Sequence, residues 1–129
     1  MIDIDPQQEL FTALKLGLEA KGHKTFDGVM PPESELYPFD FLGDNQQTDT
    51  ALKNAVTGVV HQTIHIWHTA KQRGTLSKML QQAKAVFYQL EHTANYSWGV
   101  RNLSTRIITD KTTNTPLLHG VIEADFYFS

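Results

Sequence analysis

Apolar residues near the start of the chain recur at helical spacing. Between Gln7 and Lys21 they stand three or four residues apart, so one face of a helix would be apolar along its length. Asp5 is a good N-cap, Pro6 suits the first helical position, and Gly22 suits the residue that ends a helix. We therefore predict a helix over Gln7–Lys21, with an apolar stripe formed by Leu10, Ala13, Leu14, Gly17 and Leu18.

A second segment shows the same periodicity more regularly. It runs from about Leu76 to Glu91 and follows Gly74 and Thr75, which are typical of a helix start. We predict a helix over this range with Thr75 as its N-cap. Its apolar stripe is formed by Leu76, Met79, Leu80, Ala83, Val86, Phe87 and Leu90.

Alternating or β-branched residues predict four strands. Tyr37–Gly43 carries aromatic residues at alternate positions, and Gly58–Thr69 is rich in valine, isoleucine and threonine. Trp98–Thr109 and Leu117–Phe128 flank the polar segment Asp110–Pro116, so we predict a hairpin there.

Two segments show neither helical spacing nor strand alternation of apolar residues. His23–Pro38 gathers Gly28, Pro31, Pro32 and Pro38, and we predict an ordered loop. Asp44–Asn54 is almost entirely polar, so we predict a mobile surface loop there.

The alternation also predicts which side of each strand is buried. In Gly58–Thr69 the even positions Val60, Gln62, Ile64 and Ile66 form the expected core face, and the odd positions carry His61, His65 and Trp67. In the last strand the even positions are again apolar or small, whereas the odd ones include His119, Glu123 and Asp125.

The order of these elements predicts an α+β fold. We expect an antiparallel sheet of about four strands with both helices on one face. A chain of 129 residues with 40% apolar side chains suits a single domain over residues 1–129.

Composition narrows the possible functions. The chain has no cysteine, which excludes disulfides, thiolate-bound zinc and a catalytic thiol, and fits a reducing cytosol. No apolar run approaches the ~20 residues of a membrane span, and Met1–Asp5 does not resemble a signal peptide, so we expect a soluble, unexported protein. The net charge of −3 makes nucleic acid a poor expected partner.

Three histidines, His61, His65 and His68, suggest a metal site. In a helix His61 and His65 would share a face, but Gln62 stands where a metalloprotease motif needs glutamate. In a strand, residues four apart lie roughly 13 Å apart, too far for one ion. We expect no metal and no cofactor, and interpret these histidines as surface or interface residues of the sheet. A small ligand-binding or metal-dependent enzyme domain that uses the His61 and His65 face remains the alternative.

No catalytic motif stands out elsewhere. There is no nucleophile elbow, and Arg73-Gly74-Thr75 is too short a signal for a phosphate loop. Glu123 and Asp125 fit a solvated or interface strand face better than acid–base catalysis. Four aromatic residues combine a ring with a polar tip, as is common at protein interfaces, although some would lie in the core: Tyr37, Trp67, Trp98 and Tyr127.

One family has a similar order of elements. The sequence resembles the small tail-completion proteins of long-tailed bacteriophages in four segments. These are the strand Val60–Trp67, the following Arg73-Gly74, the helix with Met79, Leu80 and Val86, and the final strand His119–Phe126. The family includes tail terminators and head-to-tail joining proteins. The opening helix and the proline-rich loop match too, so the resemblance covers nearly the whole chain.

The resemblance implies a virion protein without enzymatic activity. It implies a hexameric ring that terminates the tail tube or joins the tail to the head, in the virion after assembly in the host cytoplasm. The implied partners are further copies of the chain, the tail-tube protein and the head–tail connector, with DNA only passing through the ring. A generic dimeric adaptor is a further alternative. The expected contact residues are Asp44, Asn45, Gln46, Gln47, His61, His65, Arg101, Arg106, Lys111 and Asn114.

Overall fold

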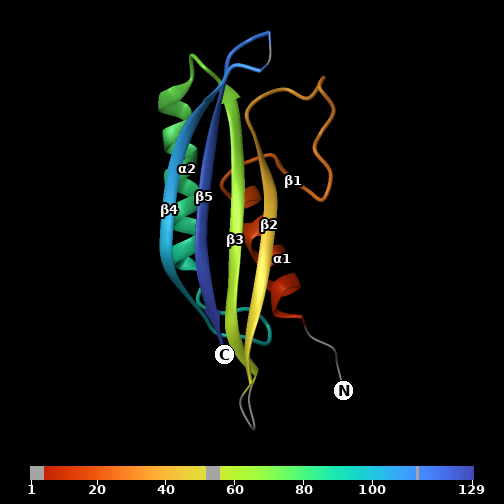
Figure 1. Cartoon of the computed structure of the whole chain (residues 1–129), viewed down its shortest axis with the longest axis vertical. Helices are drawn as coiled ribbons and strands as arrows, with labels where there is room; N and C mark the ends of the chain where they lie inside the picture. Colours follow the sequence, from red (N-terminus) through yellow and green to blue (C-terminus); the bar gives the residue numbers. More distant parts are fainter. Residues whose placement is uncertain (1–4, 52–55, 113) are drawn as a thin grey trace.

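The computed structural model describes residues 5–51, 56–112 and 114–129 and shows an α+β fold. Figure 1 shows one tall, twisted sheet with both helices on the same side of it. The elements in chain order are α1 (Pro6–Ala20), β1 (Thr25–Asp27), β2 (Phe39–Ala51), β3 (Val56–Thr69), α2 (Arg73–Gln89), β4 (Trp98–Asp110) and β5 (Leu117–Phe128).

Helix α1 begins and ends at the predicted signals. The Asp5 carboxylate accepts a hydrogen bond from the backbone N–H of Gln7 at 3.0 Å, and Pro6 is the first helical residue. Gly22 follows the helix with φ of 89°, a left-handed conformation that glycine adopts without strain. The predicted helix is therefore confirmed to within one residue at each end.

Helix α2 begins three residues before the predicted start. Gln72 is its N-cap residue and makes no side-chain capping bond, so the prediction of Thr75 as the N-cap is wrong. The first turn closes when the N–H of Leu76 donates to the carbonyl of Gln72 at 2.9 Å. Gly74 and Thr75 lie within this turn, where an imperfect helix former is tolerated.

Over the described residues the sheet has five strands in the order β1-β2-β3-β5-β4, one more than predicted. Strands β2, β3, β5 and β4 pair antiparallel, and the predicted β4–β5 hairpin is confirmed. Strand β1 lies within the predicted loop His23–Pro38 and pairs parallel with β2, so the sheet is mixed. Three residues between turn-forming segments are too few to show a strand period in the sequence.

The prediction of a mobile loop over Asp44–Asn54 is wrong for its first eight residues. Asp44–Ala51 continues β2 and pairs with β3, with Gln46 opposite His61. The register shifts between Leu42 and Asn45, a bulge that breaks the alternation. Backbone hydrogen bonds to β3 hold this segment as a strand. Its side chains can be mostly polar because Asp44–Ala51 pairs with β3 alone and lies at the edge of the sheet. Residues 52–54 lie outside the described residues.

The core lies between the helices and the even-numbered residues of β3 and β5. Leu10, Leu14 and Leu18 of α1 are fully buried, and Phe87 of α2 meets Phe126 of β5 edge to face at 5.0 Å. The predicted core faces of β3 and β5 are confirmed, including the fully buried Gln62 and Ile122. The odd-numbered residues of β3 and β5 therefore lie on the side that the helices leave uncovered (Figure 1).

Within the described residues, neither helix is both long enough and apolar enough to cross a membrane.

Candidate functional site

The uncovered side of the sheet, called here the outer face, carries most of the predicted site residues. It is formed by odd-numbered positions of β3 and β5 and their cross-strand neighbours on β2 and β4. His61, His65 and Trp67 of β3 lie there, opposite Asp125, Val121 and His119 of β5 respectively. Because β3 and β5 are interior strands that pair over their length on both sides, these side chains stand in the middle of the outer face.

His61 belongs to a hydrogen-bonded group that spans three residues. Its Nδ1 lies 2.7 Å from Oδ1 of Asp125, and the amide of Asn102 donates to Oδ2 of the same carboxylate at 2.9 Å. Asn102 has φ of 55° and lies in the β4 bulge between Arg101 and Ser104. The hydrogen bonds from Asn102 and His61 hold the pKa of Asp125 below its usual value, so this carboxylate is a fixed negative charge at neutral pH.

His65 joins a second group farther along the sheet. Its Nδ1 lies 2.7 Å from Nε2 of His119, and the His119 ring stacks on Trp67 with 3.9 Å between ring centroids and 8° between planes. Gly43 makes room for this arrangement, because a β-carbon there would lie 2.8 Å from the His65 ring. In the His65–His119 hydrogen bond one nitrogen must accept, so both rings cannot be doubly protonated without breaking it.

Burial is the main cause that lowers the pKa of both rings and keeps them neutral. Burial lowers the pKa of His119 to about 4, with a further contribution from neighbouring His65. Burial likewise lowers the pKa of His65, against the opposing effect of Asp44. At neutral pH the pair is therefore an uncharged, hydrogen-bonded contact surface rather than a cationic one.

This pair predicts a pH dependence of stability. Between pH about 4 and about 6.5 the folded chain binds fewer protons at His119 than the unfolded chain, so stability rises with pH across that window. His119→Phe keeps a ring on Trp67 but cannot titrate, and should flatten this dependence. Because His119 is only half-buried, we expect a change of about 1 kcal/mol after solvent screening. Urea unfolding at several pH values measures it, and parallel wild-type and variant profiles would contradict it.

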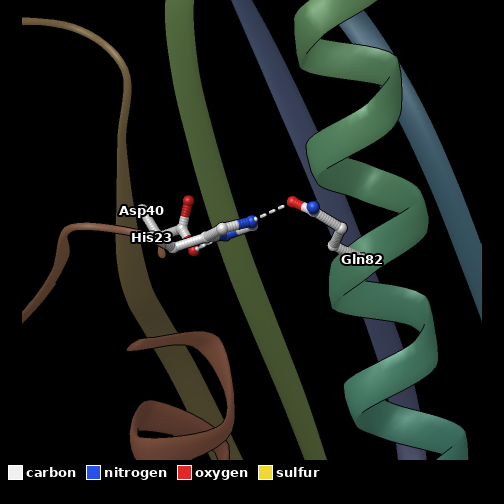
Figure 2. Close-up of polar contacts among 3 residues, drawn as sticks. All are labelled: His23, Asp40 and Gln82. Atoms are coloured by element: carbon white, nitrogen blue, oxygen red, sulfur yellow. Dashed lines mark hydrogen bonds and ion pairs between the residues drawn. The ribbon is translucent and has the colours of Figure 1, made fainter. Parts of the chain in front are cut away.

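A second polar group lies inside the molecule and was not predicted. His23 follows α1, and its Nδ1 lies 2.6 Å from Oδ2 of Asp40 on β2, while its Nε2 lies 2.7 Å from Oε1 of Gln82 on α2. Figure 2 shows the imidazole between the carboxylate and the amide that reaches across from α2. The side chains of His23 and Asp40 are 3% and 0% exposed. This group ties both helices to the sheet.

The surroundings of this buried group shift the pKa values of His23 and Asp40. Burial alone would lower the pKa of His23, but the hydrogen bond and charge of Asp40 and the hydrogen bond with Gln82 together raise it. Burial raises the pKa of Asp40, and His23 offsets only part of that effect. Both ring nitrogens face oxygen atoms, as expected of a doubly protonated imidazolium.

The three clustered histidines do not converge. His61 contacts Asp125, His65 contacts His119, and His68 lies on the helix side of the sheet at 8% exposure, where its Nδ1 accepts from the N–H of Thr69. The interpretation of His68 as a surface residue is therefore wrong, since an even position of β3 points to the core. In the described part of the chain, no three histidine or acidic side chains are arranged to hold a metal ion.

The predicted contact residues on the first strands are spread over both sides of the sheet. Asp44 is exposed at the bulge, and Gln46 lies beside His61 on the outer face. Asn45 points the other way, donating to Oε1 of buried Gln62 at 3.2 Å and accepting from Gln7 at 2.9 Å. Gln47 also pairs with a core position of β3, so the alternation of the strand puts Asn45 and Gln47 on the opposite side of the sheet from Gln46.

The remaining predicted residues lie on or beyond β4. Arg101 and Arg106 are exposed, and the Arg101 guanidinium lies 5.1 Å from the centre of the Tyr127 ring. Lys111 and Asn114 are exposed in the β4–β5 turn. The strand order places Arg101 and Arg106 in register with His61 and His65 across β5, and no pattern within one segment could show this.

The predicted aromatic residues also divide. Tyr37 and Tyr127 are 38% and 42% exposed, whereas Trp98 is 6% exposed and meets Tyr96, Phe126 and Phe128. The indole N–H of Trp98 donates to Thr93 at 2.9 Å, which satisfies its polar tip inside the core.

Comparison with known proteins supports the fold. No protein-family model and no curated protein matches this chain. The fold is similar to a chain in the virion of a native gene transfer agent particle, with a TM-score of 0.61 and 15% identity over 95% of this chain and 94% of that chain. It is also similar to the gp17 protein of bacteriophage SPP1, with a TM-score of 0.60 and 20% identity over 92% and 88% of the two chains. At these identities the likeness establishes the shared fold.

Proposed function

We propose that this chain is a structural virion protein of a tailed bacteriophage or prophage, and not an enzyme. The carrying observation is the similarity, over nearly the full length of both chains, to a chain of a gene transfer agent virion. The similarity to SPP1 gp17 covers 92% of this chain and 88% of that chain and points to a bacteriophage protein. Fold alone does not fix function, so the arrangement of the outer face has to fit the proposal as well.

The outer face suits contact with other proteins. Several of its polar and aromatic side chains are already held by one another, through the His61–Asp125–Asn102 and His65–His119–Trp67 groups. Ordered side chains lose little conformational entropy on binding, which favours association. Tyr and Trp are also enriched at protein interfaces.

The finer role follows from the resemblance of the sequence to tail-completion proteins. In this proposal the chain forms a ring, hexameric in the family, that terminates the tail tube or joins the tail to the head connector. Its partners are further copies, the tail-tube protein and the connector, with DNA passing through the ring. The exposed Lys111 and Asn114 turn lies at one end of the sheet, where it can meet the next ring.

The alternative of a metal-dependent or ligand-binding domain finds no supporting geometry in the described residues. It needs His61 and His65 to act together, but each is engaged with a different partner. Stoichiometric zinc that binds the purified chain and is lost in a His61→Ala, His65→Ala variant would favour it over the structural role.

Deletion of the gene in its native host tests the proposal. After induction of the particle, electron microscopy should show filled heads without attached tails, tails of irregular length, or both. Restoring the gene on a plasmid is the control and should restore intact particles. Normal yields of intact, infectious particles from the deletion strain would contradict the proposed role.

A further inference from the structure

The charged residues divide between the two sides of the domain. Residues 71–111, which form α2 and β4, contain seven basic and two acidic side chains, a net charge of +5. Residues 5–49, which include α1, β1 and most of β2, contain nine acidic and three basic side chains, a net charge of −6. Strands β3 and β5 stand between them: β3 has no Asp, Glu, Lys or Arg, and β5 carries Glu123 and Asp125. Although the net charge of the chain is only −3, the basic and acidic residues are therefore concentrated in different parts of the domain.

The topology places the two charges at opposite edges. Strand β4 is the last strand on one side of the order β1-β2-β3-β5-β4, and α2 packs against β5, β3 and β4. Helix α1 packs against β2 and β1 on the other side. Figure 1 shows α2 and β4 together at one edge and α1 with β1 and β2 at the other.

Ion pairs among the described residues do not neutralise the groove at the basic edge. Between α2 and β4 lies a groove of about 280 Å³, and among the described residues none of its three cations, Arg73, Lys84 and Arg106, forms an ion pair. The other groove residues are Ser77, Leu80, Gln81, Thr105 and Ile107. Three cations around one groove repel one another unless an acidic surface covers them.

Both edges also leave backbone groups open for pairing. In the part of the chain that the structure describes, strand β4 has a partner only on its β5 side. Strand β1 pairs only with Asp40, Phe41 and Leu42 of β2, so the rest of β2, which carries the exposed Asp44 and Asp49, has no strand on its outer side. Open edges of this length are natural sites for strand addition.

We propose that copies of this chain join head to tail, with the β4 and α2 edge of one copy against the β2 edge of the next. This inference rests on the proposed self-assembly and assigns the two surfaces that make it. A twofold contact would place the basic edge of one copy against the same basic edge of another. Opposite charges at opposite edges instead favour a heterologous contact, which closes into a ring when the rotation between copies allows it.

Charge reversal at each edge gives two test chains. One carries Arg101→Glu and Arg106→Glu on β4, and the other carries Asp44→Lys and Asp49→Lys on β2, four side chains that are all exposed. Lys21→Glu is the control, because it is the same kind of charge change on an exposed residue within the acidic half. Circular dichroism and urea unfolding establish that each chain is folded.

Sedimentation velocity up to about 1 mM protein measures association. Wild type and Lys21→Glu should associate, and more weakly as salt rises from about 0.1 M to about 1 M and the Debye length falls from about 10 Å to about 3 Å. Each edge variant alone should associate at least about tenfold more weakly. Mixing the two edge variants should restore association, because the glutamates of one face the lysines of the other.

Several results would overturn the inference. These are a wild type that stays monomeric throughout, an edge variant that associates like wild type, or a folded mixture that does not associate. Binding of the wild type to a DNA duplex in place of self-association would also overturn it. The virion role is tested separately by the gene deletion, so a tail defect without self-association would reject these surfaces and keep the proposed function.

Discussion

Replacing Asp40 with leucine should lower the free energy of unfolding by about 3 kcal/mol at neutral pH. The substitution leaves His23 buried at 3% exposure with one ring nitrogen no longer hydrogen-bonded, and removal of one partner of a buried pair leaves the other uncompensated. It also loosens the connection from β2 to α2 that runs through Gln82. Urea unfolding of the purified variant measures the loss.

A double variant tests whether His23 and Asp40 stabilise the fold as a pair. His23→Leu together with Asp40→Leu should cost less than the sum of the two single changes, because no polar group is then left alone. The pKa of His23 is about 6.5 in the unfolded chain and is raised in the folded chain. Below pH about 6.5, protonated His23 therefore contributes its full stabilisation, and this contribution is lost as the pH rises through the pKa of the folded state. The effect of Asp40→Leu should therefore shrink at alkaline pH. Additive single effects would show that the two residues act independently.

Gly58→Ala should destabilise the chain by about 2 kcal/mol. A β-carbon at this position in β3 would overlap the backbone oxygen of Thr48 in β2 and lie 2.9 Å from the Phe128 ring. A backbone oxygen held in a strand ladder cannot move aside easily, so the two strands must separate locally.

Gly99→Ala is the matched control. Gly99 is also a strand glycine, on β4 opposite Tyr127, but a β-carbon there meets nothing within 4 Å. Its unfolding free energy should change by no more than about 0.5 kcal/mol. Equal losses in the two variants would show that the close approach at Gly58 has no effect of its own.

The parts of the fold that the sequence predicted are those with a clear period. The Leu10, Leu14 and Leu18 stripe and the alternation of Leu117–Phe128 are local patterns, and both match the structure. Strand β1 has only three residues and shows no usable period, and the bulge after Leu42 interrupts the alternation that predicted the first part of β2. The pairing with β3, which no local pattern shows, made Asp44–Ala51 a strand.

The candidate site was predictable only as a set of residues on one face. Alternation placed His61, His65 and His119 on the same side of their strands. It did not show that His119, 54 residues after His65, would lie 2.7 Å from it. The His23–Asp40–Gln82 group depends on a helix end, a strand and a second helix meeting, which only the tertiary structure shows. The charge polarity was hidden for the same reason, since strand order decides which edge each charge occupies.

The most direct test of the central claim is the position of this chain in the particle. Gold-labelled antibody against the purified chain, imaged on intact particles and on separated heads and tails, measures it. The proposed virion role predicts label at the junction of head and tail, or at the head-proximal end of free tails. Label absent from all particles, with the chain remaining in the unassembled fraction of the lysate, would contradict the proposal.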